Sequence, residues 1–133
     1  MSKVVLIGAT GAVGGEILGI LAQRAFPLSS LKICAGERSV GRSIRFGEDA
    51  ITIEPALPEV FQGADIAFMS AGADLSRQLA PSAVAQGCSV VDNSSAFRMH
   101  PDCPLVVPEV NGALLDAFNG PGIIANPNCS TII

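Results

Sequence analysis

The chain has 133 residues, of which 49% are apolar and 15% are charged. This balance predicts one compact domain and excludes a disordered protein, in which charged residues would dominate. Lysine and arginine total 8 and aspartate and glutamate total 12, so the formal charge is −4, and no basic run occurs. Nucleic acid and anionic membrane surfaces are therefore not expected as partners.

The four cysteines lie far apart in the sequence, at positions 34, 88, 103 and 129. They form no CxxC pair and have no histidine-rich neighbourhood, so neither a metal site nor a disulfide framework is expected. The first residues hold only a short apolar run before glycines interrupt it, and no later run has the length of a membrane span. The sequence therefore predicts a cytoplasmic protein.

Short apolar runs alternate with helical patterns along the chain, as is typical of βαβ units. We predict strands at 4–7, 31–35, 66–69, 90–91, 105–107 and 123–125, with a shorter pair at 43–46 and 51–53. Helices are expected at 16–24, around 75–83, where Pro81 must kink or restart the helix, and at 113–118. This order predicts an α/β fold, namely a Rossmann-like, doubly wound, mostly parallel sheet with helices on both faces.

A glycine-rich turn, GATGAVG at 8–14, follows the first predicted strand and opens a helix. Its spacing is GxxGxxG rather than the commoner GxGxxG, yet glycine still permits a tight turn and the close approach of a ligand. Backbone N–H groups at such a helix start can hold a pyrophosphate, whereas ordinary turn chemistry is the alternative. The residues expected to bind a dinucleotide here are Gly8, Thr10, Gly11, Ala12, Val13 and Gly14.

The second predicted strand leads into Glu37, Arg38 and Ser39, about 20 residues further on, where this fold selects the ribose. Arg38 and Ser39 offer donors for a 2′-phosphate, which favours NADP as the cofactor. Glu37 would instead accept a hydrogen bond from the free 2′-hydroxyl of NAD, and a simple exposed turn is a further alternative.

Two later strands end in polar or small residues at the carboxyl edge of the sheet, where a dinucleotide lies in this fold. These candidate cofactor contacts are Ser70, Ala71, Gly72 and Asn93. Plain turn chemistry is the alternative for all four.

Cys129 follows the last predicted strand and precedes an expected helix start. A helix N-terminus favours the thiolate form of a cysteine. Such a thiolate beside a nicotinamide can attack a carbonyl, form a hemithioacetal and, after loss of hydride, leave a thioester. The other three cysteines are expected in the core.

Four ordered motifs make the chain similar to the aspartate-semialdehyde dehydrogenase family. They are GATGAVG at 8–14, VDNSSAFR at 91–98, PLVVPEVN at 104–111 and NPNCST at 126–131. The resemblance implies the NADP- and phosphate-dependent interconversion of aspartate 4-semialdehyde and 4-aspartyl phosphate, which leads to lysine, methionine, threonine and isoleucine. It implies that Cys129 is the acyl-thioester nucleophile and that Arg98 binds the substrate phosphate. Asn128 would position the substrate or donate to the developing oxyanion, with a structural role in an Asn-Pro-Asn turn as the alternative.

The resemblance also implies a second domain, which in that family carries the proton-transferring histidine, the contacts to the substrate carboxylate and most of the homodimer interface. We therefore expect residues 1–133 to form the dinucleotide-binding domain, ending just after the nucleophile, and to have little activity alone. His100 is expected to be a loop residue.

Two other functions stay open at this point. One is an enzyme similar to N-acetyl-glutamyl-phosphate reductase, although its cysteine usually lies in a Pro-Gly-Cys-Tyr setting that Asn128-Cys129-Ser130 matches poorly. The other is a non-catalytic nucleotide-binding module, which would have no need to keep Cys129 or Arg98.

Overall fold

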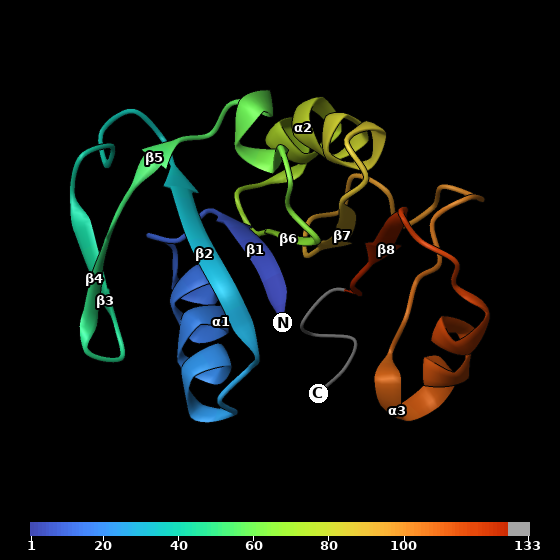
Figure 1. Ribbon diagram of the computed structural model, residues 1–133. Helices are drawn as coiled ribbons and strands as arrows, with labels where there is room; N and C mark the ends of the chain where they lie inside the picture. Colours follow the sequence, from blue (N-terminus) through green and yellow to red (C-terminus); the bar gives the residue numbers. More distant parts are fainter. Residues whose placement is uncertain (128–133) are drawn as a thin grey trace.

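Six strands form one sheet in the computed structural model, which describes residues 1–127 (Figure 1). The strands are β1 (Ser2–Ile7), β2 (Leu28–Ala35), β5 (Glu54–Pro55), β6 (Ile66–Met69), β7 (Ser89–Asp92) and β8 (Ile123–Ala125). Their order across the sheet is β5-β2-β1-β6-β7-β8, and all neighbours pair in parallel. The carboxyl ends of the strands therefore lie along one edge, and the order reverses at β1, as in doubly wound dinucleotide-binding folds. The predicted fold class is confirmed.

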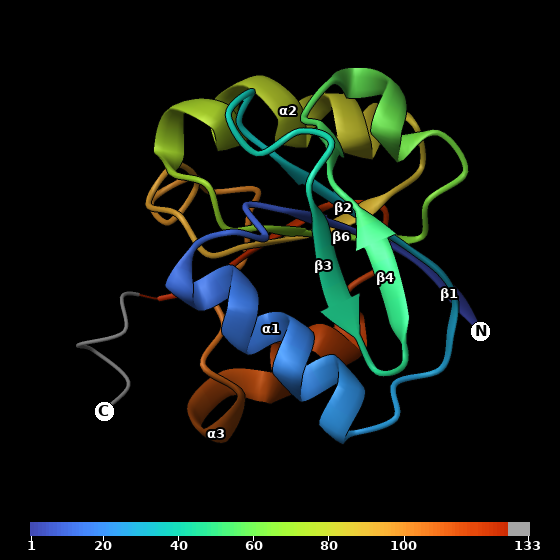
Figure 2. The same cartoon turned by 90° about the vertical axis from the view of Figure 1, so that its left-hand side faces the viewer.

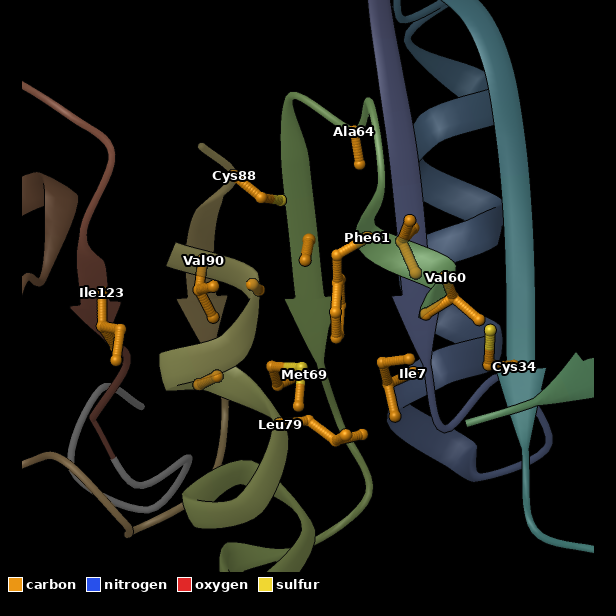
Figure 3. Packing of buried hydrophobic residues seen from close by; sticks show 14 of the residues in the cluster. Ile7, Cys34, Val60, Phe61, Ala64, Met69, Leu79, Cys88, Val90 and Ile123 are labelled. Carbon is orange, nitrogen blue, oxygen red and sulfur yellow. The ribbon is translucent and has the colours of Figure 1, made fainter. Parts of the chain in front are cut away.

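Both faces of the sheet carry apolar side chains, because successive residues of a strand point to opposite sides of the sheet. On one face, Ile7 and Met69 pack with Leu79 of helix α2 (Ala73–Ala85) and with the short 3-10 helix η1 (Pro58–Phe61) (Figure 3). On the other face, Leu6 packs with Leu18 of helix α1 (Ala12–Gln23). Figure 2 shows α1 and α2 on opposite sides of the sheet.

A separate antiparallel hairpin, β3 (Ser43–Phe46) and β4 (Asp49–Thr52), extends the cover of the α1 face. Ile44, Phe46 and Ile51 pack against the cluster that contains Leu18. The hairpin confirms the predicted strand pair but starts its second strand at Asp49 rather than at residue 51.

The first predicted elements are present with shifted bounds. β1 and β2 begin at Ser2 and Leu28, before the apolar runs, because their parallel pairing extends back to those residues. α1 begins at Ala12 rather than at residue 16, so that the helix starts inside the glycine-rich turn.

The predicted strand at 105–107 was wrong, since only Leu105 forms an isolated bridge, to Ala125. Pro104 and Pro108 flank this segment, and proline has no backbone N–H to donate to a ladder. The helix predicted at 113–118 is instead the short helix α3 (Pro108–Asn111) followed by the 3-10 helix η2 (Gly112–Ala117). Pro108 starts this helical segment early, because proline favours the first turn of a helix.

Pro81 does not restart the second predicted helix, because α2 runs from Ala73 to Ala85 with Pro81 inside it. Pro81 and Arg77 are both exposed, so the carbonyl that lacks a helical partner there can be solvated. None of the helices within residues 1–127 has the length and apolar character to cross a membrane.

Candidate functional site

A cleft of about 250 Å³ opens at the carboxyl edge of the sheet, where β1, β6 and β7 end side by side. It is lined by backbone and small polar side chains from the connections after these three strands, namely Gly11, Ala12, Val13, Ser70, Gly72, Asn93 and Ser94. All of these residues except Ser94 are among the predicted cofactor contacts. The fold thus brings together residues that are far apart in the sequence.

The glycine-rich turn passes so close to its neighbours that two of its positions have no room for a side chain. Gly8 has a φ of +96°, and a Cβ on it would collide with the carbonyl oxygen of Ser70. A Cβ on Gly14 would collide with the carbonyl oxygen of Gly8 and lie 2.9 Å from its carbonyl carbon. The N–H of Gly8 donates to the carbonyl of Cys34 at 2.9 Å, which ties the turn to the end of β2.

The start of α1 faces the cleft with free backbone donors. Gly11 is the N-cap residue, no side chain caps the helix within the described residues, and its first turn contains no acidic residue. Ala12 and Val13 of this first turn line the cleft. Unpaired N–H groups and the positive end of the helix dipole give this helix start the chemistry that could hold an anionic group such as a pyrophosphate.

Four other predicted cofactor residues, Thr10, Ala71, Arg38 and Ser39, do not line the cleft. Thr10 and Ala71 are exposed in the same two connections. Arg38 is exposed and Ser39 is half-buried in the turn after β2, which the hydrogen bond from Ser39 N–H to the Gly36 carbonyl closes at 2.9 Å. This turn follows the strand next to β1, so it lies on the carboxyl edge beside the glycine-rich turn.

Arg98 is half-buried and joins the ends of β7 and β8. Its Nε donates to the carbonyl of Asn126 at 2.8 Å and its Nη2 donates to the carbonyl of Asn93 at 3.1 Å. A guanidinium has five N–H donors in a fixed plane, so these two bonds fix its orientation and leave donors for an anion.

Asp92 is fully buried and holds the turn that carries Asn93 and Ser94. Its carboxylate accepts hydrogen bonds from Ser76 Oγ at 2.9 Å, from Ser94 N–H at 2.8 Å and from Ser94 Oγ at 3.0 Å. Because Ser76 belongs to α2, this network ties the helix on one face of the sheet to the lining of the cleft.

Sequence reasoning missed Ser76, Asp92, Ser94 and Asn126 as members of the site. An aspartate followed two residues later by a serine, at the end of an apolar strand, is the signature of a turn closed by the carboxylate. That signal was available for Asp92 and Ser94. Ser76 and Asn126 carried no such local signal, since their partners are 16 and 33 positions away.

The described cysteines are core residues, as predicted, and their surroundings suppress the thiolate. Removal from water raises the pKa of Cys34 to about 12 and that of Cys88 to about 11, with smaller contributions from the nearby carboxylates of Glu54 and Asp65. Burial also raises the pKa of Cys103. None of these three thiols is suited to act as a nucleophile.

The two predicted catalytic residues, Asn128 and Cys129, lie outside the described residues. The last described positions, Asn126 and Pro127, continue from β8 at the same edge of the sheet as the cleft. His100 is exposed in a loop, as predicted, where its Nδ1 accepts a hydrogen bond from the N–H of Asp102 at 3.2 Å.

A parallel sheet with this strand order, a glycine-rich turn after β1 and an open helix start at the reversal point define a Rossmann-type dinucleotide-binding domain. The family model described as semialdehyde dehydrogenase, NAD binding domain, matches residues 3–117. The chain belongs to this family.

Individual relatives match this chain over nearly its whole length, and their names are consistent with this family. Aspartate-semialdehyde dehydrogenase of Bacillus subtilis is 50% identical over 129 residues, which are 97% of this chain and 37% of the relative. A crystal structure of aspartate semialdehyde dehydrogenase II from Vibrio cholerae, complexed with ASA, matches with a TM-score of 0.92 and 44% identity over 99% of this chain and 43% of that one. Aspartate semialdehyde dehydrogenase with NADP from Candida albicans has a TM-score of 0.78 and 28% identity, and the match covers 99% of this chain and 44% of that one. The chain therefore spans less than half the length of these relatives.

Proposed function

We propose that the chain is the NADP-binding domain of an aspartate-semialdehyde dehydrogenase. Such an enzyme interconverts L-aspartate 4-semialdehyde, phosphate and NADP with L-4-aspartyl phosphate and NADPH. The observation that carries the proposal is the N-terminus of α1. No side chain caps it, it follows directly on the tightly packed glycine-rich turn, and it faces a cleft at the point where the strand order of the sheet reverses. The names of the relatives support this choice of substrate.

The residues around the cleft fit a dinucleotide phosphate. Gly8 and Gly14 allow the glycine-rich turn to pack against the Ser70 carbonyl and against itself, which a Cβ would prevent, and the N–H groups at the start of α1 would bind the pyrophosphate. Arg38 and Ser39 would bind the 2′-phosphate from the end of β2, and Asn93, Ser70 and Gly72 would contact the remainder from the ends of β6 and β7. When bound, NADP supplies the hydride acceptor.

The chemistry at the substrate is assigned to Cys129, Asn128 and Arg98. The Cys129 thiolate adds to the aldehyde carbon and forms a C–S bond, which gives a hemithioacetal whose oxidation yields a thioester. A phosphate oxygen then attacks the thioester carbonyl, the C–S bond breaks, and the thiolate leaves as the acyl phosphate forms. Arg98 binds the phosphate and Asn128 donates to the oxyanion.

We further propose that residues 1–133 form the cofactor-binding half of a cytoplasmic homodimer. The histidine that transfers protons and the groups that bind the substrate carboxylate belong, in this proposal, to a second domain. The proposed partners are aspartate 4-semialdehyde and phosphate.

The cofactor assignment is tested by titrating the chain with NADP and NAD in a calorimeter. We expect NADP to bind more tightly, and Arg38→Ala to weaken NADP binding by about tenfold, equivalent to about 1.4 kcal/mol, without weakening NAD binding. Arg24→Ala removes the same charge at the far end of α1 and serves as the control. Tighter binding of NAD by the unmodified chain would overturn the choice of NADP.

The catalytic assignment is tested in the complete product of the reading frame, with NADPH formation from aspartate 4-semialdehyde and phosphate as the assay. Cys129→Ser should abolish activity, and substrate should protect Cys129 from alkylation. A thiol that reacts slowly and without protection supports the non-catalytic module. Activity with an N-acetyl-glutamyl substrate instead supports the reductase.

Arg98 gives a second, graded test of the same assignment. Arg98→Lys keeps the charge but loses the planar fork, so the KM for phosphate should rise by about tenfold or more. An unchanged phosphate KM in this variant would show that Arg98 serves only to join β7 and β8.

A further inference from the structure

Asn126 does not line the cleft, yet its polar groups form hydrogen bonds with three residues at the same edge of the sheet. Its backbone N–H donates to the carbonyl of Asp92 at 2.8 Å, and its own carbonyl accepts from Arg98 Nε at 2.8 Å. Its side-chain Nδ2 donates to Oδ1 of Asn93 at 2.7 Å. Both asparagines are half-buried, and Asn93 lines the cleft.

The bond between the two side chains decides which group Asn93 can offer to a ligand. A carboxamide has one oxygen, which accepts, and one NH2 group, which donates. The hydrogen bond from Asn126 directs the oxygen of Asn93 toward Asn126, so the NH2 group of Asn93, on the other side of the amide, points away from Asn126 and is left to donate to a ligand. The amide of Asn93 would otherwise be free to rotate by half a turn and present its oxygen.

We propose that Asn126 is a positioning residue that makes Asn93 a hydrogen-bond donor toward an acceptor oxygen of the bound dinucleotide. The inference rests on the proposed function, because NADP is the ligand that it concerns. It adds a residue that acts through Asn93 and contacts no cofactor itself.

Asn126 contacts Arg98 and Asn93 through different atoms, one in its backbone and one in its side chain, and this difference gives the experiment an internal control. Arg98 is bound by the backbone carbonyl of Asn126, so a change of the side chain leaves this contact in place. Asn93 is bound by the side chain, so the same change releases it. A positioning role therefore affects NADP affinity and spares the KM for phosphate, whereas general damage to the strand ends would affect both.

The test uses Asn126→Asp in the complete product of the reading frame. An aspartate can only accept, so Asn93 would turn its NH2 toward residue 126 and its oxygen toward the cleft. We expect NADP affinity to fall by about tenfold or more, while the KM for phosphate, measured at about 0.5 M salt to screen the added charge near Arg98, stays within about twofold of the value for the unmodified protein. Asn126→Ala leaves Asn93 free to rotate and should cause a smaller loss. Asn119→Asp, at an exposed position, adds the same charge and should change neither value.

Salt separates the amide reversal from simple charge repulsion. Repulsion between an added carboxylate and the cofactor phosphates weakens at about 0.5 M salt, whereas a reversed amide is unaffected. A loss that disappears at high salt, or NADP affinity within about twofold of the original, would overturn the inference. If Asn126→Asp fails to fold, Asn93→Asp provides the second variant. It keeps the bond from Asn126 but removes the donor, so it must also weaken NADP binding.

Side-chain amide NMR of the protein without NADP tests the orientation of the Asn93 amide independently of cofactor binding, so it separates this inference from the proposed function. In the unmodified protein the Asn126 NH2 should exchange slowly with solvent and the Asn93 NH2 rapidly, and Asn126→Asp should slow the exchange of the Asn93 NH2. A slowly exchanging Asn93 NH2 in the unmodified protein would contradict the inference. Failure of the protein to bind NADP would contradict the proposed function instead.

Discussion

At the scale of single residues, the site depends on the missing side chain of Gly14. Gly14 lies in the first turn of α1, where alanine would favour the helix by about 1 kcal/mol. A Cβ there would collide with the Gly8 carbonyl oxygen and lie 3.0 Å from Ala9 Cα, both of which are backbone atoms that cannot easily move. We therefore expect Gly14→Ala to lower the free energy of unfolding by about 1–3 kcal/mol, measured by urea denaturation.

Gly19 of the same helix provides the matched control. An added Cβ at Gly19 meets nothing within 4 Å, so Gly19→Ala should stabilise the chain by up to about 1 kcal/mol. If Gly14→Ala stabilises the chain as Gly19→Ala does, this result would contradict the close contact between α1 and the backbone of the glycine-rich turn.

Asp92 is the second residue on which the site depends, through its buried carboxylate. Its replacement by alanine leaves Ser76 and two donors of Ser94 without an acceptor in a buried place. We expect Asp92→Ala to destabilise the chain by about 3–5 kcal/mol and Ser76→Ala by about 1–2 kcal/mol in thermal or urea unfolding. Ser29→Ala, at an exposed position, should cost less than about 0.5 kcal/mol. Equal effects of the three substitutions would contradict the network.

At the scale of the element, α2 contains a proline that lowers its stability. Pro81 provides no N–H for a helical hydrogen bond, yet the helix continues to Ala85 because Leu79, Ala80 and Ala83 are buried against the sheet. Pro81→Ala should restore this bond and raise the free energy of unfolding by about 1–2 kcal/mol, less than the full helix penalty of about 3 kcal/mol for proline. Gln78→Ala, at another exposed position of α2, should change it by less than about 0.5 kcal/mol. A lower stability of Pro81→Ala would show that the proline fits a bend that the packing of α2 requires.

At the scale of the whole molecule, burial of three thiols predicts how stability depends on pH. The folded state raises the pKa of Cys34 to about 12 and of Cys88 to about 11 from an ordinary value of 9.0. Above pH 9 the unfolded chain therefore releases protons that the folded chain keeps, and folding stability falls as the pH rises. The loss should reach about 1.4 kcal/mol per pH unit for each thiol and should end near the folded pKa values.

Urea denaturation at a series of pH values measures this loss. The chain contains no tyrosine, so no phenol contributes to the pH dependence in this range. Cys34→Ala should make the pH dependence shallower between pH 9 and 12. A pH profile that is the same with and without Cys34 would contradict the raised pKa.

Much of the fold was predictable because its signals are local. The apolar runs at β1 and β6 indicated buried parallel strands, and the glycine spacing after β1 indicated a turn that opens a helix. The strand predicted at 105–107 failed because apolar character alone does not show whether a neighbouring strand offers a full ladder. Two prolines beside it leave a single bridge to Ala125.

By itself, the sequence determined the class of this protein and most residues of its cleft. Positions such as Gly11 and Gly72 follow strand ends, and the ends of parallel strands converge on one edge of a sheet. Only the tertiary structure decided which distant polar groups hold that cleft in place. The bonds from Ser76 to Asp92 and from Asn126 to Asn93 join side chains that no local pattern relates, because they depend on where α2 and β8 pack against β7.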